Sequence, residues 1–402
     1  MTTQQNSYLC GLHNIGNTCY MNSVLQILIH NKLLQDHFIT HEFKDALVNY
    51  TKEQLKNKNS IITTETVNQG MTTTLTYQFY QLVASMRTEK IIAPKTFKMI
   101  LGSKNEMFNG YAQNDAHELL NFILDTIHEE TKYSVEPCMQ SLPKAYHTIE
   151  RVKKEFNERI NKTVDFDIRR DIIYSYNTFE ASFPQEVSIH NGMAYWAKYI
   201  KNNFSIVSYH FMGVYQSTIE CSQCKHNSQS FEPFTTVSLE IPIQEKINVY
   251  DCLNNFTTCE TLTDKYDCSV CNLKTIGKKS ISFWNTPDVL FIHFKRFKLN
   301  EQPTPNRKIV GYSKINNHID YPKVLDLCQY VSKYNKKTAV YNLTSVIHHY
   351  GNHGSGHYLC YNKIGDVWCE FNDGNITAIT NFEKQIMTSA SYILVYSKLS
   401  DN

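Results

Sequence analysis

The sequence predicts an α+β fold, with helices in the first third of the chain and strands in its second half. Apolar residues in the first third recur at helical spacing, most regularly between residues 113 and 130. From about residue 211 the pattern changes to short runs typical of strands. Because the helices come first and the strands later, an α+β architecture is favoured over a βαβ alternation. The expected strands are 215–220, 236–241, 289–294, 341–349, 357–362, 367–371 and 392–396.

The composition is that of an ordinary folded chain, whose length permits two or three domains or one elaborated domain. Its 402 residues are 42% hydrophobic and 19% charged, and the formal net charge is only +2. No global field therefore draws the protein to nucleic acid or to an anionic membrane. The most apolar runs, 24–29 and 289–294, are too short to span a bilayer. We expect neither nucleic acid nor a membrane as a partner.

The N-terminus and the cysteines indicate the compartment. Residues 1–7 are polar and lack the charged-then-apolar order of a signal peptide. Twelve cysteines in a chain of this length fall short of the density of a small secreted disulfide scaffold. Four of them form two C-x-x-C pairs, which points to metal binding. We expect a soluble protein of a reducing compartment, cytoplasmic and/or nuclear.

Cys19 is a candidate nucleophile because of the residues around it. Gly16 and Asn17 permit a tight turn, and the apolar stripe that follows predicts a helix beginning at Cys19. The positive end of a helix dipole favours the reactive thiolate. Unsatisfied backbone N–H groups at this point, together with the side-chain amide of Asn14, are suited to hold the oxyanion of a tetrahedral intermediate. The stripe consists of Met21, Val24, Leu25 and Leu28.

His357 is the candidate base, since a thiolate nucleophile needs a histidine that takes and returns a proton. It stands where a glycine-rich loop, 351–356, enters a strand. Gly365 and Asp366 form a hairpin signal between this strand and the next. Folding about that turn brings residue 357 opposite residue 372, within one or two positions of register. Asn372 is therefore expected to accept the Nδ1–H of His357 and to fix its tautomer.

The two C-x-x-C pairs predict a structural zinc site. Cys221 and Cys224 form one pair, and Cys268 and Cys271 form the other. A two-residue spacer lets each pair chelate from one turn, and four thiolates complete a tetrahedral zinc site. The alternative, a redox-active pair, is disfavoured because neither pair precedes a predicted helix. Two further cysteines lack this spacing and are not expected to bind the metal: Cys252 and Cys259.

The segment 133–191 differs from the rest of the chain because it mixes charges freely. One amphipathic helix is expected within it, marked by Ile149, Val152, Phe156 and Ile160. The plainer interpretation is a surface helix whose apolar stripe covers part of the domain. The alternative is an insertion that docks a protein partner.

These motifs together resemble a known family. The segment 11–22 is similar to the cysteine box of the ubiquitin-specific proteases, papain-like deubiquitinases that carry Gly-Leu-x-Asn-x-Gly-x-Thr-Cys-Tyr-Met-Asn. The segment around His357 resembles their histidine box, Gly-His-Tyr followed by Phe-Asp/Asn-Asp. The resemblance implies that Cys19 is the nucleophile and Asn14 the oxyanion donor. It also makes Asn372 the orienter of His357.

The third catalytic member is left open between Asn372 and Asp373. Family members carry either Asp or Asn at the first of these positions, so Asn372 matches the orienter. A neutral amide orients an imidazolium but does not neutralise it, whereas the carboxylate of Asp373 supplies a charge. Asp373 is therefore kept as a second candidate.

The resemblance covers nearly the whole chain and implies one catalytic domain, 8–397, with a papain-like cysteine protease core. Its expected parts are a helical thumb with the cysteine box, a family-variable insertion, β fingers that grip ubiquitin, and a β-rich palm with the histidine box. A single structural Zn²⁺ is implied in the fingers, and no catalytic metal. The expected bounds of the four parts are 8–132, 133–191, 205–285 and 286–397.

The resemblance also implies the substrate, which is ubiquitin on ubiquitinated proteins. The helix beginning near Gln113 carries Asp115 and Glu118 three residues apart, a pair suited to the arginines of a basic tail. The matching residues of the family contact that tail, and Tyr358 of the histidine box is expected to contribute. The implied reaction is thiol-dependent hydrolysis of the (iso)peptide bond after the C-terminal glycine of ubiquitin. The alternatives are a protease for another ubiquitin-like modifier and a catalytically inactive ubiquitin-binding module.

Overall fold

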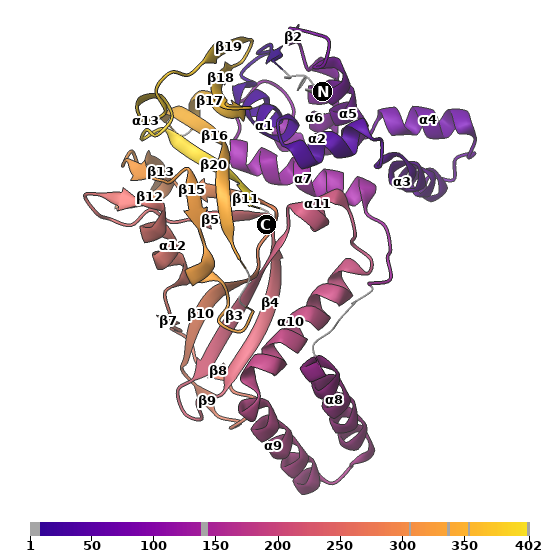
Figure 1. Cartoon of the computed structure of the whole chain (residues 1–402), viewed down its shortest axis with the longest axis vertical. Coiled ribbons are helices and arrows are strands. Elements are labelled where there is room, and N and C mark those ends of the chain that lie inside the picture. The colour runs from indigo at the N-terminus through magenta and orange to yellow at the C-terminus, as the bar shows by residue number, and fades with distance from the viewer. Residues whose placement is uncertain (1–8, 138–143, 305–306, 336–337, 353, 400–402) are drawn as a thin grey trace.

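The computed structural model describes residues 9–137, 144–304, 307–335, 338–352 and 354–399. Residue 8, the expected start of the catalytic domain, and residues 138–143 of the expected insertion lie outside the described residues. Figure 1 shows helices gathered at one end of the molecule, a sheet beside them, and a long β unit that extends away from both. We call these parts the thumb, the palm and the fingers, and define each below by its elements.

The thumb is a helical layer built around α1 (Cys19–Ile29), which begins at Cys19 as predicted and is buried at all 11 positions. Its neighbour α7 (Ala116–Thr131) buries the predicted apolar stripe. Asp115 caps α7 by accepting hydrogen bonds from two backbone N–H groups of the first turn. The other thumb elements are β1 (Gly11–Leu12), α2 (Lys32–Ile39), α3 (Lys44–Asn57), α4 (Thr64–Thr72), α5 (Leu75–Ser85), β2 (Ile91–Ile92) and α6 (Lys95–Lys104).

The palm is an eight-stranded sheet in the order β19-β18-β17-β16-β20-β11-β5, with β15 on the side of β16. Its strand β11 has the predicted bounds, Val289–Phe294, and is buried at every position. Alternate side chains point to opposite faces of a strand, so one set of β11 residues packs on the thumb core and the other on a second core. The other strands are β5 (Thr236–Leu239), β15 (Val324–Asp326), β16 (Val340–Asn352), β17 (Ser355–Ile364), β18 (Val367–Asn372), β19 (Asn375–Ala378) and β20 (Ser391–Lys398).

The fingers are a four-stranded sheet in the order β4-β3-β10-β7, which ends in the short ribbon β8–β9. β5 lies within the segment 205–285 expected for the fingers, yet it pairs in parallel with β11 of the palm. The helix α12 (Val249–Thr257) from the same segment also packs in the second core through Val249 and Leu253. The finger strands are β3 (Gly213–Cys221), β4 (Asn227–Phe234), β7 (Glu260–Thr261), β8 (Tyr266–Asp267), β9 (Lys274–Thr275) and β10 (Gly277–Asn285).

The insertion between thumb and fingers contains three helices in its described residues, where the sequence predicted one. The predicted amphipathic helix is α8 (Lys144–Lys162), and α9 (Phe166–Ser182) turns back against it. The third, α10 (Pro184–Ile200), runs past residue 191 and lies along the fingers. A Cβ added to Gly192 would meet the ring of Trp284 on β10 at 2.1 Å, so helix and sheet are in close contact.

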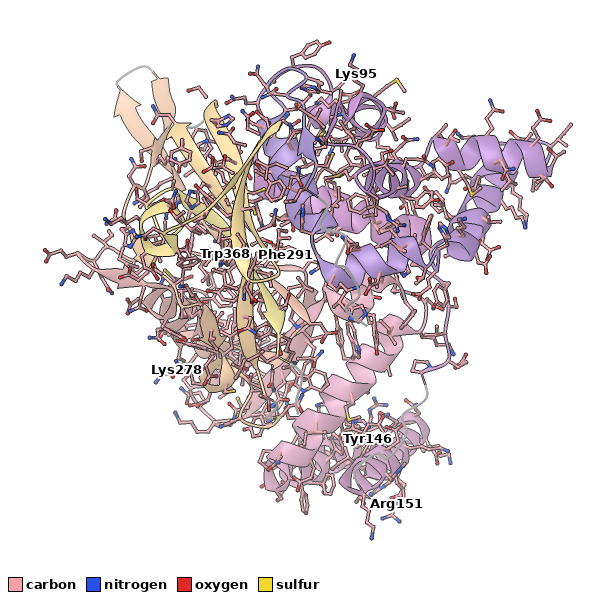
Figure 2. All side chains as sticks on the ribbon, turned by 45° about the horizontal axis from the view of Figure 1, so that its top comes forward. Lys95, Tyr146, Arg151, Lys278, Phe291 and Trp368 are labelled. Carbon is pink, nitrogen blue, oxygen red and sulfur yellow. The ribbon has the colours of Figure 1, made fainter. Side chains whose placement is uncertain are left out.

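The end of the insertion projects from the molecule. Figure 2 shows Tyr146 and Arg151 on the insertion, apart from Lys278 on the fingers and Phe291 in the palm. Large apolar side chains near the α8–α9 turn are exposed, with Val164 at 96%. A docking role for the insertion stays a prediction. None of the helices in the described residues is long and apolar enough to cross a membrane.

The remaining elements connect these parts. Two of them, β12 and β13, form an antiparallel ribbon beside the palm. Their bounds and those of the other connecting elements are η1 (Glu106–Phe108), α11 (Ile206–His210), β6 (Ile247–Asn248), β12 (Phe297–Thr304), β13 (Arg307–Lys314), β14 (Ile319–Asp320), η2 (Cys328–Tyr330) and α13 (Phe382–Gln385).

Candidate active site

The turn before Cys19 is held by the side chain of Asn14. Its Oδ1 accepts hydrogen bonds from the backbone N–H groups of Gly16 at 3.2 Å and Thr18 at 3.0 Å. Gly16 and Asn17 have positive φ angles of 114° and 51°, the left-handed backbone that glycine and asparagine adopt most readily. The predicted tight turn is therefore present. It presents Cys19, only 2% exposed, at the N-terminal end of α1.

His357 on β17 contacts Asn372 at the end of β18, as predicted, but through the other ring nitrogen. The Nε2 of His357 lies 2.8 Å from the Oδ1 of Asn372, where Nδ1 was expected. The physical reason is the register. Cys360 pairs with Phe371, which puts residue 359 opposite residue 372. Residue 357 is therefore two positions away along β17. The side chains meet along a diagonal, and Nε2, the outer nitrogen of the ring, reaches farther.

The thiol of Cys19 lies close enough to the imidazole of His357 to act on its pKa. It is the largest cause of a rise in the pKa of His357 to about 9, by hydrogen bonding to the charged ring. Burial acts in the opposite direction, and Asn372 and the charges of Cys19 and Asp373 add to the rise. A histidine with this pKa is held as an imidazolium at neutral pH, the form that stabilises a neighbouring thiolate and can protonate a leaving amine.

Asp373 binds the thumb through its carboxylate. Its Oδ2 accepts from Asn14 Nδ2 at 3.0 Å and its Oδ1 accepts from Asn22 Nδ2 at 2.7 Å. Its backbone carbonyl accepts from Leu12 N–H at 2.9 Å. Asp373 has a positive φ of 51°, which is uncommon for a residue other than glycine. The carboxylate thus orients the amide of Asn14, in the turn before Cys19.

The predicted substrate-binding residues Asp115, Glu118 and Tyr358 line one groove with a volume of about 250 Å³. The groove lies between the start of α7 and the hairpin of β16 and β17. Glu118 is exposed in it, whereas Tyr358 is only 5% exposed. The structure therefore brings the three side chains together, with Glu118 the most accessible of them.

Asp115 has a structural task in addition to its place in the groove. One carboxylate oxygen caps α7, and the other accepts a hydrogen bond from the hydroxyl of Tyr392 on β20. Burial raises the pKa of Tyr392 far above its ordinary value, and the charge of Asp115 adds to the rise. Asp115 therefore joins the thumb to the palm.

The four cysteines predicted to bind metal meet at the fingertip. The Sγ atoms of Cys221, Cys224, Cys268 and Cys271 all lie within 4.8 Å of one another. The Cys221–Cys271 and Cys224–Cys268 sulfur distances are 3.9 Å and 3.7 Å. Sulfurs bound to tetrahedral zinc at about 2.3 Å are about 3.8 Å apart, so the cluster fits such an ion.

Both cysteine pairs use the same backbone turn. Lys225 N–H donates to the carbonyl of Cys221, and Asn272 N–H donates to the carbonyl of Cys268, at 3.0 Å and 2.9 Å. Lys225 and Asn272 both have positive φ, at 60° and 55°. The repeated turn supports a shared ligand. The cysteines not expected to bind metal are separate from the cluster: Cys252 is buried in α12, where burial raises its pKa to about 12, and Cys259 is exposed.

Three side chains at the site were not found by sequence reasoning. Asn22 follows Cys19 by one helical turn and binds Asp373. Tyr392 binds Asp115, and Gln113 binds the backbone of Gly356. Asn22 is part of the cysteine-box pattern, which is the one signal that could have drawn attention to it. Gln113 opens the segment that carries Asp115 and Glu118, but the sequence does not indicate its partner. Tyr392 is linked to Asp115 only by the fold.

A cysteine and a histidine in contact, with an amide orienting the histidine at a helix–sheet interface, define a thiol-dependent hydrolase. The model of a family described as "Ubiquitin carboxyl-terminal hydrolase" matches residues 10–396. The chain belongs to this family, whose members are cysteine-protease deubiquitinases. The predicted family, enzyme class and general function are confirmed.

Curated relatives carry the same family name. A probable ubiquitin carboxyl-terminal hydrolase of Acanthamoeba polyphaga mimivirus is 29% identical over 96% of this chain and 90% of the relative. Ubiquitin carboxyl-terminal hydrolase Usp2 of Drosophila melanogaster is 27% identical over 97% of this chain and 35% of the relative. Ubiquitin carboxyl-terminal hydrolase 2 of Bos taurus is 27% identical over the whole chain. The chain spans 57% of the bovine relative.

Solved structures confirm the fold. The SAGA DUB module bound to monoubiquitin matches the whole chain with a TM-score of 0.65 and 22% identity, over 71% of that structure's chain. The SAGA DUB module bound to ubiquitin aldehyde matches with a TM-score of 0.64 and 22% identity, over 72% of its chain. The predicted α+β fold class is therefore confirmed.

Proposed function

We propose that this chain hydrolyses the peptide or isopeptide bond after the C-terminal glycine of ubiquitin, with Cys19 as nucleophile. The observation that carries the proposal is the position of His357, which contacts Cys19 on one side and Asn372 on the other. The family match and the ubiquitin-bound modules of similar fold support ubiquitin as the substrate.

In the first half of the reaction, the thiolate of Cys19 attacks the carbonyl carbon of the terminal glycine. The carbonyl oxygen becomes an oxyanion, and Asn14 is placed to stabilise it. One N–H of the Asn14 amide donates to Asp373, and the second remains to donate to the oxyanion. His357 then gives its proton to the leaving amine as the C–N bond breaks, which produces a thioester on Cys19.

In the second half, neutral His357 takes a proton from water, and the resulting hydroxide attacks the thioester. The C–S bond breaks, and ubiquitin leaves as a carboxylic acid that releases its proton to water. The proton on His357 restores the imidazolium beside the thiolate. Asn372 holds the ring in both states because its Oδ1 accepts the Nε2–H throughout.

We propose that the cysteine cluster of the fingers binds one structural Zn²⁺. Four thiolates leave no open position, so the ion would fix the fingertip rather than activate water. Its place at the end of β3 and in the β8–β9 ribbon suits a part that grips the body of ubiquitin. The two C-x-x-C pairs suit thiolate ligands of a metal, which favours a reducing compartment such as the cytoplasm or nucleus.

The test of the proposed function is turnover of a fluorogenic ubiquitin C-terminal amide. The intact chain should hydrolyse it, and Cys19→Ala should abolish hydrolysis while ubiquitin binding is retained. Reaction with ubiquitin and with ubiquitin-like modifiers, each carrying a thiol-reactive C-terminus, identifies the modifier. Activity that survives in Cys19→Ala would remove Cys19 from the mechanism.

A further inference from the structure

A glutamine side chain joins the thumb to β17, the strand that carries His357. Gln113 Nε2 donates to the backbone carbonyl of Gly356 at 2.6 Å, and Gly356 N–H donates to Gln113 Oε1 at 2.7 Å. Gly356 is the residue directly before His357. The amide of Gln113 therefore engages both backbone polar groups of one residue, as a neighbouring strand would.

The two partners belong to the two halves of the active site. Gln113 lies in the thumb, just before Asp115, the cap of α7, and α7 packs beside α1. Gly356 lies on β17 of the palm, two residues after the turn glycine Gly354. The hydrogen bonds therefore cross from the element that supports the nucleophile to the strand that carries the base.

The backbone at Gly356 is held on its other side by close packing. A Cβ added there would lie 2.2 Å from the carbonyl oxygen of Tyr350 and 2.5 Å from the Nε2 of His349, so only glycine fits. Gly351 and Gly354 nearby both have positive φ, at 95° and 76°. Glycines give a turn conformational freedom and no side chains to pack. The two hydrogen bonds between Gln113 and Gly356 restrict that freedom next to His357.

We propose that Gln113 is a positioning residue for the reaction. It fixes the residue before His357 against the thumb and so holds the imidazole within hydrogen-bond reach of Cys19. The proposal rests on the proposed function, because it takes Cys19 and His357 as the reacting pair. Displacement of a reacting group by about 1 Å costs on the order of 100-fold in rate, so two bonds at this point have a large effect on turnover.

Gln113 also lines the groove that contains Asp115 and Glu118. A residue in that place that merely contacted the substrate would affect binding of the ubiquitin tail. The two roles are separated by a measurement that involves no ubiquitin. Alkylation of Cys19 by iodoacetamide reports how readily the thiolate forms, and this depends on the neighbouring imidazolium.

The experiment compares wild type with two variants of Gln113 and one control. Gln113→Ala removes the amide, and Gln113→Asn keeps it on a side chain too short to make both hydrogen bonds to Gly356. The control is Gln54→Ala. Gln54 is exposed on α3. Alkylation of the Cys19 peptide is followed by mass spectrometry as a function of pH. In both Gln113 variants a given alkylation rate should be reached only at a pH about one unit higher than in wild type. A shift of one unit corresponds to a tenfold smaller thiolate fraction at the same pH. Their kcat for the ubiquitin amide should fall at least about tenfold with little change in KM, while Gln54→Ala matches wild type.

The positioning role is overturned if the alkylation profile of Gln113→Ala overlays that of wild type. This holds regardless of any change in KM or in the melting temperature. A rise in KM would then assign Gln113 to substrate contact, and a lower melting temperature would assign it to stability. Wild-type turnover tests the proposed function separately, since an inactive wild type with a shifted Gln113→Ala profile would leave the positioning role standing.

Discussion

The imidazole of His357 reaches the amide of Asn372 along a diagonal of the β17–β18 hairpin, Nε2 to Oδ1 at 2.8 Å. Asp373, the next residue, turns away on a positive φ and binds Asn14 and Asn22. Two adjacent residues therefore serve opposite sides of the site. Asn372 contacts the imidazole of His357, the proposed base, and the carboxylate of Asp373 holds the amide of Asn14 near Cys19, the proposed nucleophile.

This division predicts different effects for the two alanine substitutions. Asn372→Ala should lower kcat on the order of tenfold or more, because the ring loses its orienting acceptor. Asn372→Asp should keep much of the activity, since a carboxylate oxygen also accepts the Nε2–H. Turnover of the ubiquitin amide measures both.

Asp373→Ala should also lower kcat, chiefly through Asn14, since the charge of Asp373 is only the smallest of the causes that raise the pKa of His357. The effect of Asp373→Ala should therefore be small when Asn14→Ala is already present, which a double-mutant cycle measures. Fully additive losses in that cycle would contradict the assignment of Asp373 to Asn14. Equal small effects of Asn372→Ala and Asp373→Ala would remove both residues from the mechanism.

The pH dependence follows from the raised pKa of His357, about 9 against an ordinary 6.5. A raised folded-state pKa means that the protonated form stabilises the native chain. This contribution is complete below about pH 6.5 and is lost as the pH rises through 9. The alkaline limb of kcat/KM should fall near pH 9, as the imidazolium loses the proton that the leaving amine needs. Asn372→Ala removes a hydrogen bond that raises the pKa of His357, so the alkaline limb should move to lower pH in this variant. If the limb does not move, it reports the titration of another group.

The two acids of the groove should separate into a binding residue and a structural residue. Glu118→Gln removes a charge at an exposed position and should raise KM about tenfold, the equivalent of about 1.4 kcal/mol. Asp115→Ala removes the cap of α7 and the partner of Tyr392, and it should destabilise the chain by at least about 1 kcal/mol. Steady-state kinetics and denaturant unfolding measure these effects. A Glu118→Gln variant with unchanged KM would exclude that carboxylate from tail binding.

Zinc removal should affect substrate capture more than chemistry. Cys224→Ser should lose the metal, melt at a lower temperature and bind ubiquitin more weakly. Cys259→Ser, at an exposed cysteine outside the cluster, should change none of these. Metal analysis of the wild type should give about one zinc per chain. Full zinc content in Cys224→Ser would mean that the wrong cysteines have been paired.

The sequence could predict features whose signals lie close together along the chain. The apolar spacing after Cys19 places α1, and the run Val289–Phe294 gives β11 its observed bounds. The hairpin signal at 365–366 brings His357 to Asn372. Each of these depends on residues within a few turns of helix or one strand of each other, where periodicity and turn chemistry act directly.

Contacts between distant segments could not be predicted in this way. Gln113 is 243 residues from Gly356, and Asn22 is 351 residues from Asp373. No spacing rule links such pairs. The insertion shows a related limit, since Ile172 is the one buried residue of α9. A helix that buries little leaves a weak apolar stripe in its sequence, and only the more amphipathic α8 was expected.

Each half of the cysteine cluster lies on its own hairpin turn, and Cys224 and Cys268 are 44 residues apart. Two thiolates alone hold zinc weakly, so firm capture waits until both turns have met, after the intervening loop has closed. The thumb and palm cores contain none of the four cysteines and can assemble beforehand. Zinc supply would therefore set the fraction of folded chains that bind substrate tightly. It would not alter the rate at which bound substrate is hydrolysed.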